Sequence, residues 1–297
     1  MRLLQNKYIP KITFFVITLM ASSSCHQKSD TETSSFTEWR LGIVPDQNIQ
    51  KLEKTYLPLV EYISHATGIK GRLIIPPTYS AIVDSFKIGK INIALFGGAT
   101  FIKAHLESDA QPIALRNVDL RSSSIVLVNV KHYASTLKDL KGVSFGFGSR
   151  LSTSGHLMPR YFFNQLGIKP ETFFSDVNYS KSHNETALKV QNGDITAGVI
   201  NSEVIQKMFH SGELNVNKVK VIWQSPPFAD YVWASQSTMS SKQIQAFRDA
   251  LLNLSMKNPE HKKILTELGA DYYVPASMDD FNELKEIILT QNLINGY

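Results

Sequence analysis

The sequence predicts an α/β protein built from two similar units. Short β-rich runs alternate with segments whose apolar residues recur at helical spacing. Such alternation indicates mostly parallel sheets joined by crossover helices. A weak internal repeat at an offset of 104 residues aligns residues 79–94 with residues 183–198 and indicates the second unit.

The first unit opens with a strand at residues 41–44 and a helix at residues 49–65. The helix is predicted because apolar residues recur at three- and four-residue intervals between Leu52 and Ile63. The elements that follow are predicted to be strands at residues 72–75 and 91–96 and helices at residues 79–88 and 99–106.

The second unit is predicted to contain strands at residues 123–130 and 142–147. A helix at residues 155–166 is closed by Gly167 and Pro170, because glycine commonly ends a helix and proline cannot continue one. The C-terminal part is predicted to be helical at residues 243–254, 260–268 and 278–289.

The repeat brings Gly89 into register with Gly193, and Ile91 with Ile195. The same offset lays the strand at residues 41–44 on the strand that ends at Phe147. Chance or shared α/β patterning is the alternative explanation. Two similar α/β units nevertheless suggest two lobes, with a ligand cleft at the carboxyl ends of the strands.

The N-terminus has the layout of a secretory signal. Basic residues without an acidic one precede an apolar run at residues 12–21, which is too short to cross a bilayer. Three serines then precede Cys25, the only cysteine. This segment resembles the lipobox of bacterial lipoproteins, although Ser22 stands where an aliphatic residue is preferred. The alternative is an ordinary signal with a chance cysteine.

The bulk composition indicates a globular body without disulfides. The hydrophobic fraction of 43% argues against disorder, and Cys25 has no partner cysteine. Residues 26–37 are polar and Ser/Thr-rich, which is typical of a tether. The net charge of +5 falls to +2 without Arg2, Lys7 and Lys11, so nothing calls for nucleic acid as a partner.

The most informative motif is Ser152-Thr153-Ser154-Gly155-His156, which follows a predicted strand and opens a predicted helix. Three hydroxyls and the free N–H groups of a helix N-terminus make a donor-rich pocket with positive potential. Such a pocket suits phosphate, phosphonate or another tetrahedral oxyanion. The alternative is a plain Ser/Thr N-cap on a surface helix.

This motif, with the Pro and aromatic residues after it in residues 145–163, resembles the signature segment of phosphate/phosphite/phosphonate-binding proteins of ABC importers, the PhnD-like periplasmic solute-binding proteins. Ser182-His183 resembles another stretch of that family. The resemblance spans nearly all of the mature body. Further matching segments lie at residues 79–94, 137–145, 192–198 and 225–231.

The resemblance implies a type II periplasmic binding protein, an α/β fold of two lobes with a ligand cleft between them. It also implies an importer component that hands an oxyanion to ABC permease subunits, located in the periplasm or at the cell surface and anchored by lipid. The expected division is a signal peptide at 1–24, lipidated Cys25 with the tether at 25–37, lobe 1 at 38–126 plus 231–297, and lobe 2 at 127–230. Hinge motion is expected near residues 124–130 and 221–234.

Carried over by position, the resemblance also implies the ligand-binding residues. The hydroxyls of the Ser-Thr-Ser run would hold the oxyanion, with one further donor from each lobe and two carboxylates facing a substrate ammonium. These residues are Ser152, Thr153 and Ser154, then Tyr79 and His183, then Glu203 and Asp230.

Other interpretations stand beside these. His183 could cap its helix or lie exposed, and Asp230 could pair with a protein cation. His156 is expected to be exposed or to lie behind the site. Phe101 stands where the family often has tyrosine, so one oxyanion donor is expected to be missing.

Two other functions compete with transport. The protein could be an enzyme, or it could be a ligand-sensing module of a signalling system. The Gly-x-Ser-x-Gly pattern of serine hydrolases fails around Ser154, and Leu151 stands where a dinucleotide fingerprint needs its third glycine. The eight histidines are scattered and no His-Glu-x-x-His occurs. No catalysis, metal or cofactor is therefore expected.

Lipidation of Cys25 is directly testable. Cys25→Ser should abolish incorporation of labelled fatty acid and move the protein from the membrane fraction to the soluble one, because the thiol is the acylated group. A wild-type protein that takes up no label would rule out the anchor.

Overall fold

The structure is a computed structural model that describes residues 36–291 and 294. The signal peptide, Cys25 and the tether up to residue 35 lie outside the described residues. Within the described residues, no helix has the length and apolar character needed to span a membrane.

The first sheet has six strands in the order β11-β4-β10-β3-β1-β2. Strands β1, β2 and β3 pair in parallel, whereas β10 runs antiparallel to both β3 and β4. The parallel strands carry the crossover helices that the alternating sequence pattern predicts. The strands are β1 (Trp39–Ile43), β2 (Gly71–Ile74), β3 (Ile93–Phe96), β4 (Gln111–Arg116), β10 (Val232–Ser235) and β11 (Tyr273–Pro275).

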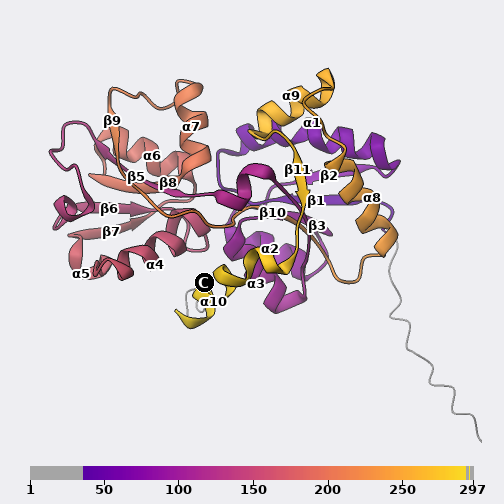
Figure 1. Cartoon of the computed structure of the whole chain (residues 1–297), viewed down its shortest axis with the longest axis horizontal. Helices are drawn as coiled ribbons and strands as arrows, with labels where there is room; N and C mark the ends of the chain where they lie inside the picture. Colours follow the sequence, from indigo (N-terminus) through magenta and orange to yellow (C-terminus); the bar gives the residue numbers. More distant parts are fainter. Residues whose placement is uncertain (1–35, 292–293, 295–297) are drawn as a thin grey trace, which may run out of the picture. The chain divides into compact units, whose positions relative to one another are not determined.

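Six helices cover the two faces of this sheet (Figure 1). Helix α1 packs with α8 and α9 on one face, and α3 packs with α2 and α10 on the other. Each helix buries one apolar stripe, as its sequence spacing predicts. They are α1 (Ile49–Thr67), α2 (Tyr79–Lys87), α3 (Gly98–Ser108), α8 (Ser241–Leu252), α9 (Pro259–Leu268) and α10 (Asn282–Thr290).

The second sheet has five strands in the order β7-β6-β8-β5-β9. Residues of β5 alternate between its two faces: Val126 packs into the cluster around Phe163, and Leu127 into the cluster around Val190. The strands are β5 (Ser124–Asn129), β6 (Ser144–Phe147), β7 (Asp176–Tyr179), β8 (Ala197–Asn201) and β9 (Val219–Gln224), and the helices are α4 (Met158–Gln165), α5 (Pro170–Phe173), α6 (His183–Asn192) and α7 (Ser202–His210).

The 104-residue repeat is present in the pairing register of the two sheets. Leu41 of β1 pairs with Leu73 and Ile93, while Phe145 of β6 pairs with Val177 and Ala197, each partner displaced by the same offset. Helices α2 and α6, and likewise α3 and α7, begin at positions separated by that offset. The two sheets are therefore two copies of one α/β arrangement.

Several predicted boundaries shift. The helix expected at residues 155–166 begins instead as a π-helical turn, Thr153–Leu157, that continues into α4. The short strands β4 and β11 were not expected, because each contains a proline and pairs only through neighbours distant in sequence. In β4 that residue is Pro112, and in β11 it is Pro275.

Two segments connect the sheets, and they pair with each other. The 3₁₀ turn Asn117–Arg121 leads from β4 to β5, and residues 225–231 lead from β9 to β10. Ser122 and Phe228 form an isolated antiparallel bridge, and Phe228 N donates to Ser122 O at 2.9 Å. The expected lobe boundary at residue 126/127 thus falls inside β5, which pairs with the second sheet from Ser124 onward.

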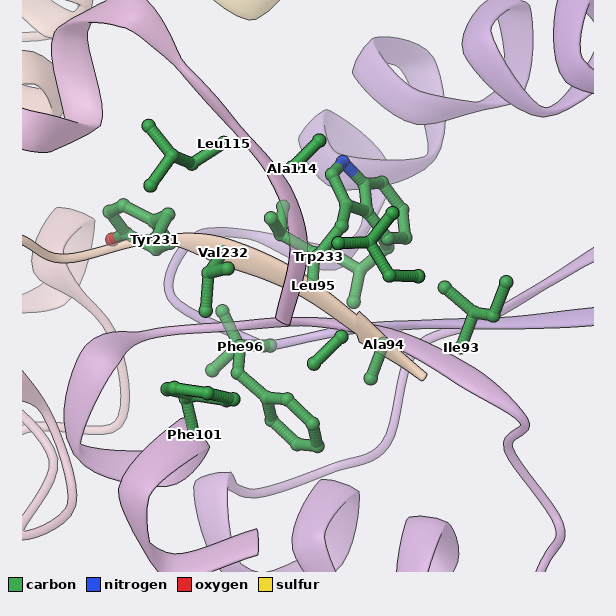
Figure 2. Close-up of a cluster of buried hydrophobic side chains, with 14 of the residues drawn as sticks. Ile93, Ala94, Leu95, Phe96, Phe101, Ala114, Leu115, Tyr231, Val232 and Trp233 are labelled. Carbon is green, nitrogen blue, oxygen red and sulfur yellow. The ribbon is translucent and has the colours of Figure 1, made fainter. Parts of the chain in front are cut away.

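Phe101 belongs to the core of the first sheet. Its side chain is fully buried and its ring lies 4.9 Å from that of Phe281, centroid to centroid. Figure 2 shows it beside Phe96 and below β10. The apolar surroundings explain why a phenylalanine suffices at this position.

Candidate binding site

The Ser-Thr-Ser run lies buried at the carboxyl end of β6. Ser152 N donates to Ser149 O at 2.8 Å, which closes a turn, and Ser152 Oγ caps the following helical turn by accepting from Gly155 N at 3.0 Å. Ser152, Thr153 and Ser154 are each at most 2% exposed. We refer to these three residues as the cradle.

Gly155 allows the tight backbone geometry of the cradle. A Cβ atom there would lie 2.8 Å from Ser152 Oγ and 3.2 Å from the Cα of Gly148. Gly148 N also donates to Gly155 O at 2.8 Å, which holds the two backbones together. A larger residue at 155 would push the cradle open.

The N-terminus of α3, from the first sheet, meets the cradle. Its N-cap is Gly97, which has no side chain to satisfy the first free N–H groups. Gly98 N therefore donates to Asp230 Oδ1 and Ala99 N to Thr153 Oγ1, both at 3.0 Å. The latter bond joins the two α/β units across the site.

Asp230 is buried beside the cradle, and no cation among the described residues pairs with it. It is 1% exposed, and burial raises the pKa of its carboxyl to about 6 despite the hydrogen bond from Gly98 and bonds with Thr153 and Ser154. The nearby Arg116 is engaged elsewhere, since its Nε donates to Asp119 Oδ2 at 2.8 Å. The alternative interpretation, a pairing of Asp230 with a protein cation, does not occur in the described part of the chain.

Asn201 links the cradle to Asp230. Its Nδ2 lies 3.1 Å from Ser154 Oγ, 3.0 Å from Ser122 Oγ and 3.4 Å from Asp230 Oδ2. Its Oδ1 caps α7 by accepting from the N–H groups of residues 203 and 204. Asn201 was not predicted as a site residue, although the repeat places it opposite Gly97 at the start of the equivalent helix.

His183 presents an unused buried donor. Its Nδ1 accepts from Asn201 N at 3.4 Å, so its proton is assigned to Nε2, and Nε2 is buried with no hydrogen-bond partner among the described residues. Burial lowers the pKa of the imidazole to about 4, which keeps the ring neutral. The helix cap is Ser182, not His183, and His183 is only 1% exposed.

Tyr79 approaches the cradle from the first unit. It begins α2, is 4% exposed, and its hydroxyl hydrogen-bonds Ser152. Burial, with the charges of Asp46 and Asp230, holds its pKa well above the ordinary value. The phenol therefore stays protonated and can donate.

Asp46 is a second buried carboxylate that the sequence analysis missed. Its Oδ2 accepts from Tyr231 Oη at 2.6 Å, and its carbonyl accepts from His183 N at 2.9 Å. Burial raises its pKa. Asp46 follows a strand and a proline, a context common to many surface turns, so only its position at a strand end could have indicated it.

Glu203 lies outside this group. Its side chain is half-buried and lines a small pocket of about 20 Å³ with Asp46, Tyr231 and Lys207. Burial lowers the pKa of Lys207 to about 8. The structure thus brings together six of the seven expected site residues and places Glu203 at the edge.

His156 is held behind the cradle. Its Nδ1 lies 2.7 Å from Arg150 O, and its Nε2 accepts from Arg160 Nε at 3.0 Å. Burial lowers its pKa to about 4. Among the described residues, no group of three or more His, Cys, Asp or Glu side chains is placed to hold a metal ion.

The pKa of Asp230 makes the stability of the ligand-free protein depend on pH. Between pH 3.8, the ordinary aspartate value, and about 6, the folded protein holds a proton that the unfolded chain has lost, so stability falls as pH rises through this window. Asp230→Asn should therefore raise the free energy of unfolding at pH 7.5 by on the order of 2 kcal/mol and leave it unchanged near pH 4.

Urea unfolding of both proteins at a series of pH values checks this. The matched control is Asp194→Asn, which removes an exposed carboxylate. A difference between wild type and Asp230→Asn that stays constant from pH 4 to pH 7.5 would contradict the assigned burial cost.

The chain matches a known protein family over most of its length. The family described as the periplasmic phosphonate substrate-binding protein of ABC transporters matches residues 41–281. The probable ABC transporter phosphite binding protein PhnD1 of Prochlorococcus marinus is 28% identical over 260 residues, covering 84% of this chain and 88% of that protein. The phosphonates-binding periplasmic protein of Escherichia coli is 29% identical over 239 residues, covering 77% and 69%.

Solved structures agree. PhnD1 of Prochlorococcus marinus in complex with methylphosphonate superposes with a TM-score of 0.82, 28% identity and coverage of 87% of this chain and 99% of that one. A binding protein component of a phosphonate ABC transporter from Pseudomonas aeruginosa has the same fold, with a TM-score of 0.80, 23% identity and 87% of both chains covered. The predicted type II periplasmic binding protein fold is confirmed, as is the predicted family: the chain belongs to the phosphonate-binding family of periplasmic substrate-binding proteins of ABC transporters.

Proposed function

We propose that this protein captures a small phosphonate-, phosphite- or phosphate-like oxyanion at the cradle and delivers it to an ABC permease. The observation that carries the proposal is the buried Nε2–H of His183, which has no hydrogen-bond partner among the described residues. The three cradle hydroxyls and the Tyr79 phenol belong to the same buried group. An unpaired buried donor costs about 1–3 kcal/mol, and an anionic oxygen would remove that cost.

The relatives support this ligand class. The 28% identical Prochlorococcus protein binds methylphosphonate in its solved structure and is described as a phosphite binding protein. The methyl and hydrogen substituents of these ligands are small.

Asp230 sets a condition on the ligand. Its Oδ1 is used by Gly98 N, and its carboxylate would repel a fully deprotonated oxyanion held by the adjacent cradle. The condition is met by a ligand that donates a proton to Asp230, either from a P–OH group or from an ammonium. Glu203 lies farther out, where an ammonium on a longer substituent would meet it.

Closure of two lobes around the ligand is part of the proposal. Contacts across the cleft are short: Ala99 N donates to Thr153 Oγ1, and Lys51 pairs with Glu213 at 2.9 Å. The paired segments around Ser122 and Phe228 are the place for the hinge, because they alone among the described connections lead from one sheet to the other.

A binding function fits the site better than hydrolysis. The only hydrogen bond that the His183 ring makes within the described residues comes from the Asn201 amide, so no cradle serine has its hydroxyl proton held by a histidine base. The family is periplasmic. We propose further that Cys25 is lipidated and holds the protein at the membrane beside its permease.

Removal of cradle hydroxyls tests the ligand site. Ser152→Ala and Thr153→Ala should each weaken methylphosphonate binding roughly ten- to a hundredfold, because a hydrogen bond to a charged group contributes about 1.5–3 kcal/mol. Titration calorimetry measures the dissociation constants.

Ser240→Ala is the matched control. It removes an N-cap serine from α8, whose Oγ accepts from Gln243 N, without touching the cradle. Ser240→Ala should lower the free energy of unfolding by about as much as the cradle substitutions do. It should leave the affinity for methylphosphonate unchanged. If the double variant Ser152→Ala/Thr153→Ala binds as tightly as wild type, the cradle is merely a helix cap.

A further inference from the structure

A second pocket adjoins the cradle at the carboxyl ends of β6 and β7. It has a volume of about 280 Å³. Arg150 follows β6, while Tyr179, Ser180 and Lys181 lie at the end of β7 and directly after it. Tyr79 of the first unit forms the opposite wall. The carboxyl ends of parallel strands are the usual location of ligand sites in α/β folds.

This pocket is joined to the cradle by one side chain and one turn. Tyr79 lines the pocket and hydrogen-bonds Ser152 of the cradle. Arg150 lies within the turn that the 2.8 Å bond from Ser152 N to Ser149 O closes. A turn of this kind keeps the Cα atoms of its first and last residues within about 7 Å, so Arg150 belongs to the same short loop that carries the first cradle residue.

The pocket is positively charged. Arg150 and Lys181 line it, and no carboxylate is among the described residues that do. The guanidinium of Arg150 lies 3.8 Å above the centre of the Tyr179 ring, which fixes its position. Glu185, which contacts the backbone of Lys181, does not line the pocket: its Oε2 accepts from the Lys181 N–H, and its Oε1 pairs with Lys189 at 2.7 Å.

Ser180 adds a buried hydroxyl that no group in the described part of the chain uses. Its side chain lines the pocket and is 4% exposed, and its Oγ has no hydrogen-bond partner among the described residues. A ligand oxygen in the pocket could accept from this hydroxyl. Two cations and a free hydroxyl form the donor set that suits a carboxylate.

The small pocket beside Asp46 differs in charge. Asp46 and Glu203 line it together with Arg116 and Lys207, so both signs of charge are present there. The described lining of the pocket at Arg150 and Lys181 carries positive charge without a carboxylate, so a second anionic group on the ligand is attracted there.

We propose that this pocket is a second anion subsite, which binds the carboxylate of a carboxy-phosphonate whose phosphonate group occupies the cradle. The inference rests on the proposed function of the cradle. It extends the ligand class from small oxyanions to phosphonates that carry a carboxylate one or two carbons from phosphorus.

Calorimetry with methylphosphonate, phosphonoacetate and 3-phosphonopropionate tests the proposal. For each protein, the dissociation constant of methylphosphonate is divided by that of whichever carboxylate compound binds more tightly. This ratio measures the preference for a carboxylate. Lys181→Gln should lower this ratio about threefold, as expected for an exposed charge pair, and Arg150→Gln about tenfold. Raising the ionic strength should lower the wild-type ratio as well.

Lys181 is exposed, so its variant isolates charge from folding, and circular dichroism verifies the fold of Arg150→Gln. Lys242→Gln, which removes an exposed lysine at the start of α8, should leave the ratio unchanged. If methylphosphonate binds and both pocket variants keep the wild-type ratio, this inference is wrong while the cradle stands. If methylphosphonate itself does not bind, the proposed function fails and the inference fails with it.

Discussion

The site depends on one constraint: the Asp230 carboxylate is buried, and no cation in the described part of the chain pairs with it. A buried charge must be compensated, and here the compensation comes from the free N-terminus of α3, from Asn201 and from the cradle hydroxyls. These groups belong to both α/β units and to the segments that connect them. Asp230 N also donates to Asp119 O, so the carboxylate is anchored within the paired crossings. The elements around the site are thus positioned by the need to satisfy one acidic side chain.

The internal repeat shows how one arrangement yields two different half-sites. Thr78 and Ser182 occupy equivalent positions and cap α2 and α6 in the same way, each accepting from the N–H three residues on. The residues after these caps are Tyr79 and His183, and both reach the cradle or lie against it. One fold position therefore supplies one donor from each unit.

Gly97 and Asn201 also occupy equivalent positions in the repeat, but they differ in how they cap the helix that follows. Asn201 caps its own helix, whereas Gly97 leaves the N-terminus of α3 open. The positive end of α3 can therefore hold Asp230, and the equivalent end of α7 is already satisfied. Because Gly97 and Asn201 differ, the open helix N-terminus lies on the cradle side of the site. The carboxylates of Asp46 and Asp230 lie near the same donors.

Much of this arrangement could be predicted from the sequence, for identifiable reasons. Alternating periodicity gave the α/β class, and the 104-residue offset matched the pairing register of Leu41 and Phe145. The Ser-Thr-Ser run was recognisable because consecutive hydroxyls after a strand are unusual. Asp46 and Asn201 were not, because single polar residues at strand ends resemble ordinary turn and cap residues. Whether Glu203 lies at the cradle or away from it depends on which face of α7 carries its side chain. The residues next to it in the sequence do not determine that face.

The most direct test of the central claim compares methylphosphonate with methanesulfonate, which has a similar shape but no proton to donate near neutral pH. With Asp230 ionised at pH 7.5, methylphosphonate should bind at least about a hundredfold more tightly, since apposed like charges cost several kcal/mol. The preference should narrow at pH 5, below the pKa of about 6, because a protonated Asp230 can itself donate to the sulfonate. Equal affinities for the two ligands at pH 7.5, or a preference that does not change between the two pH values, would contradict the role assigned to Asp230.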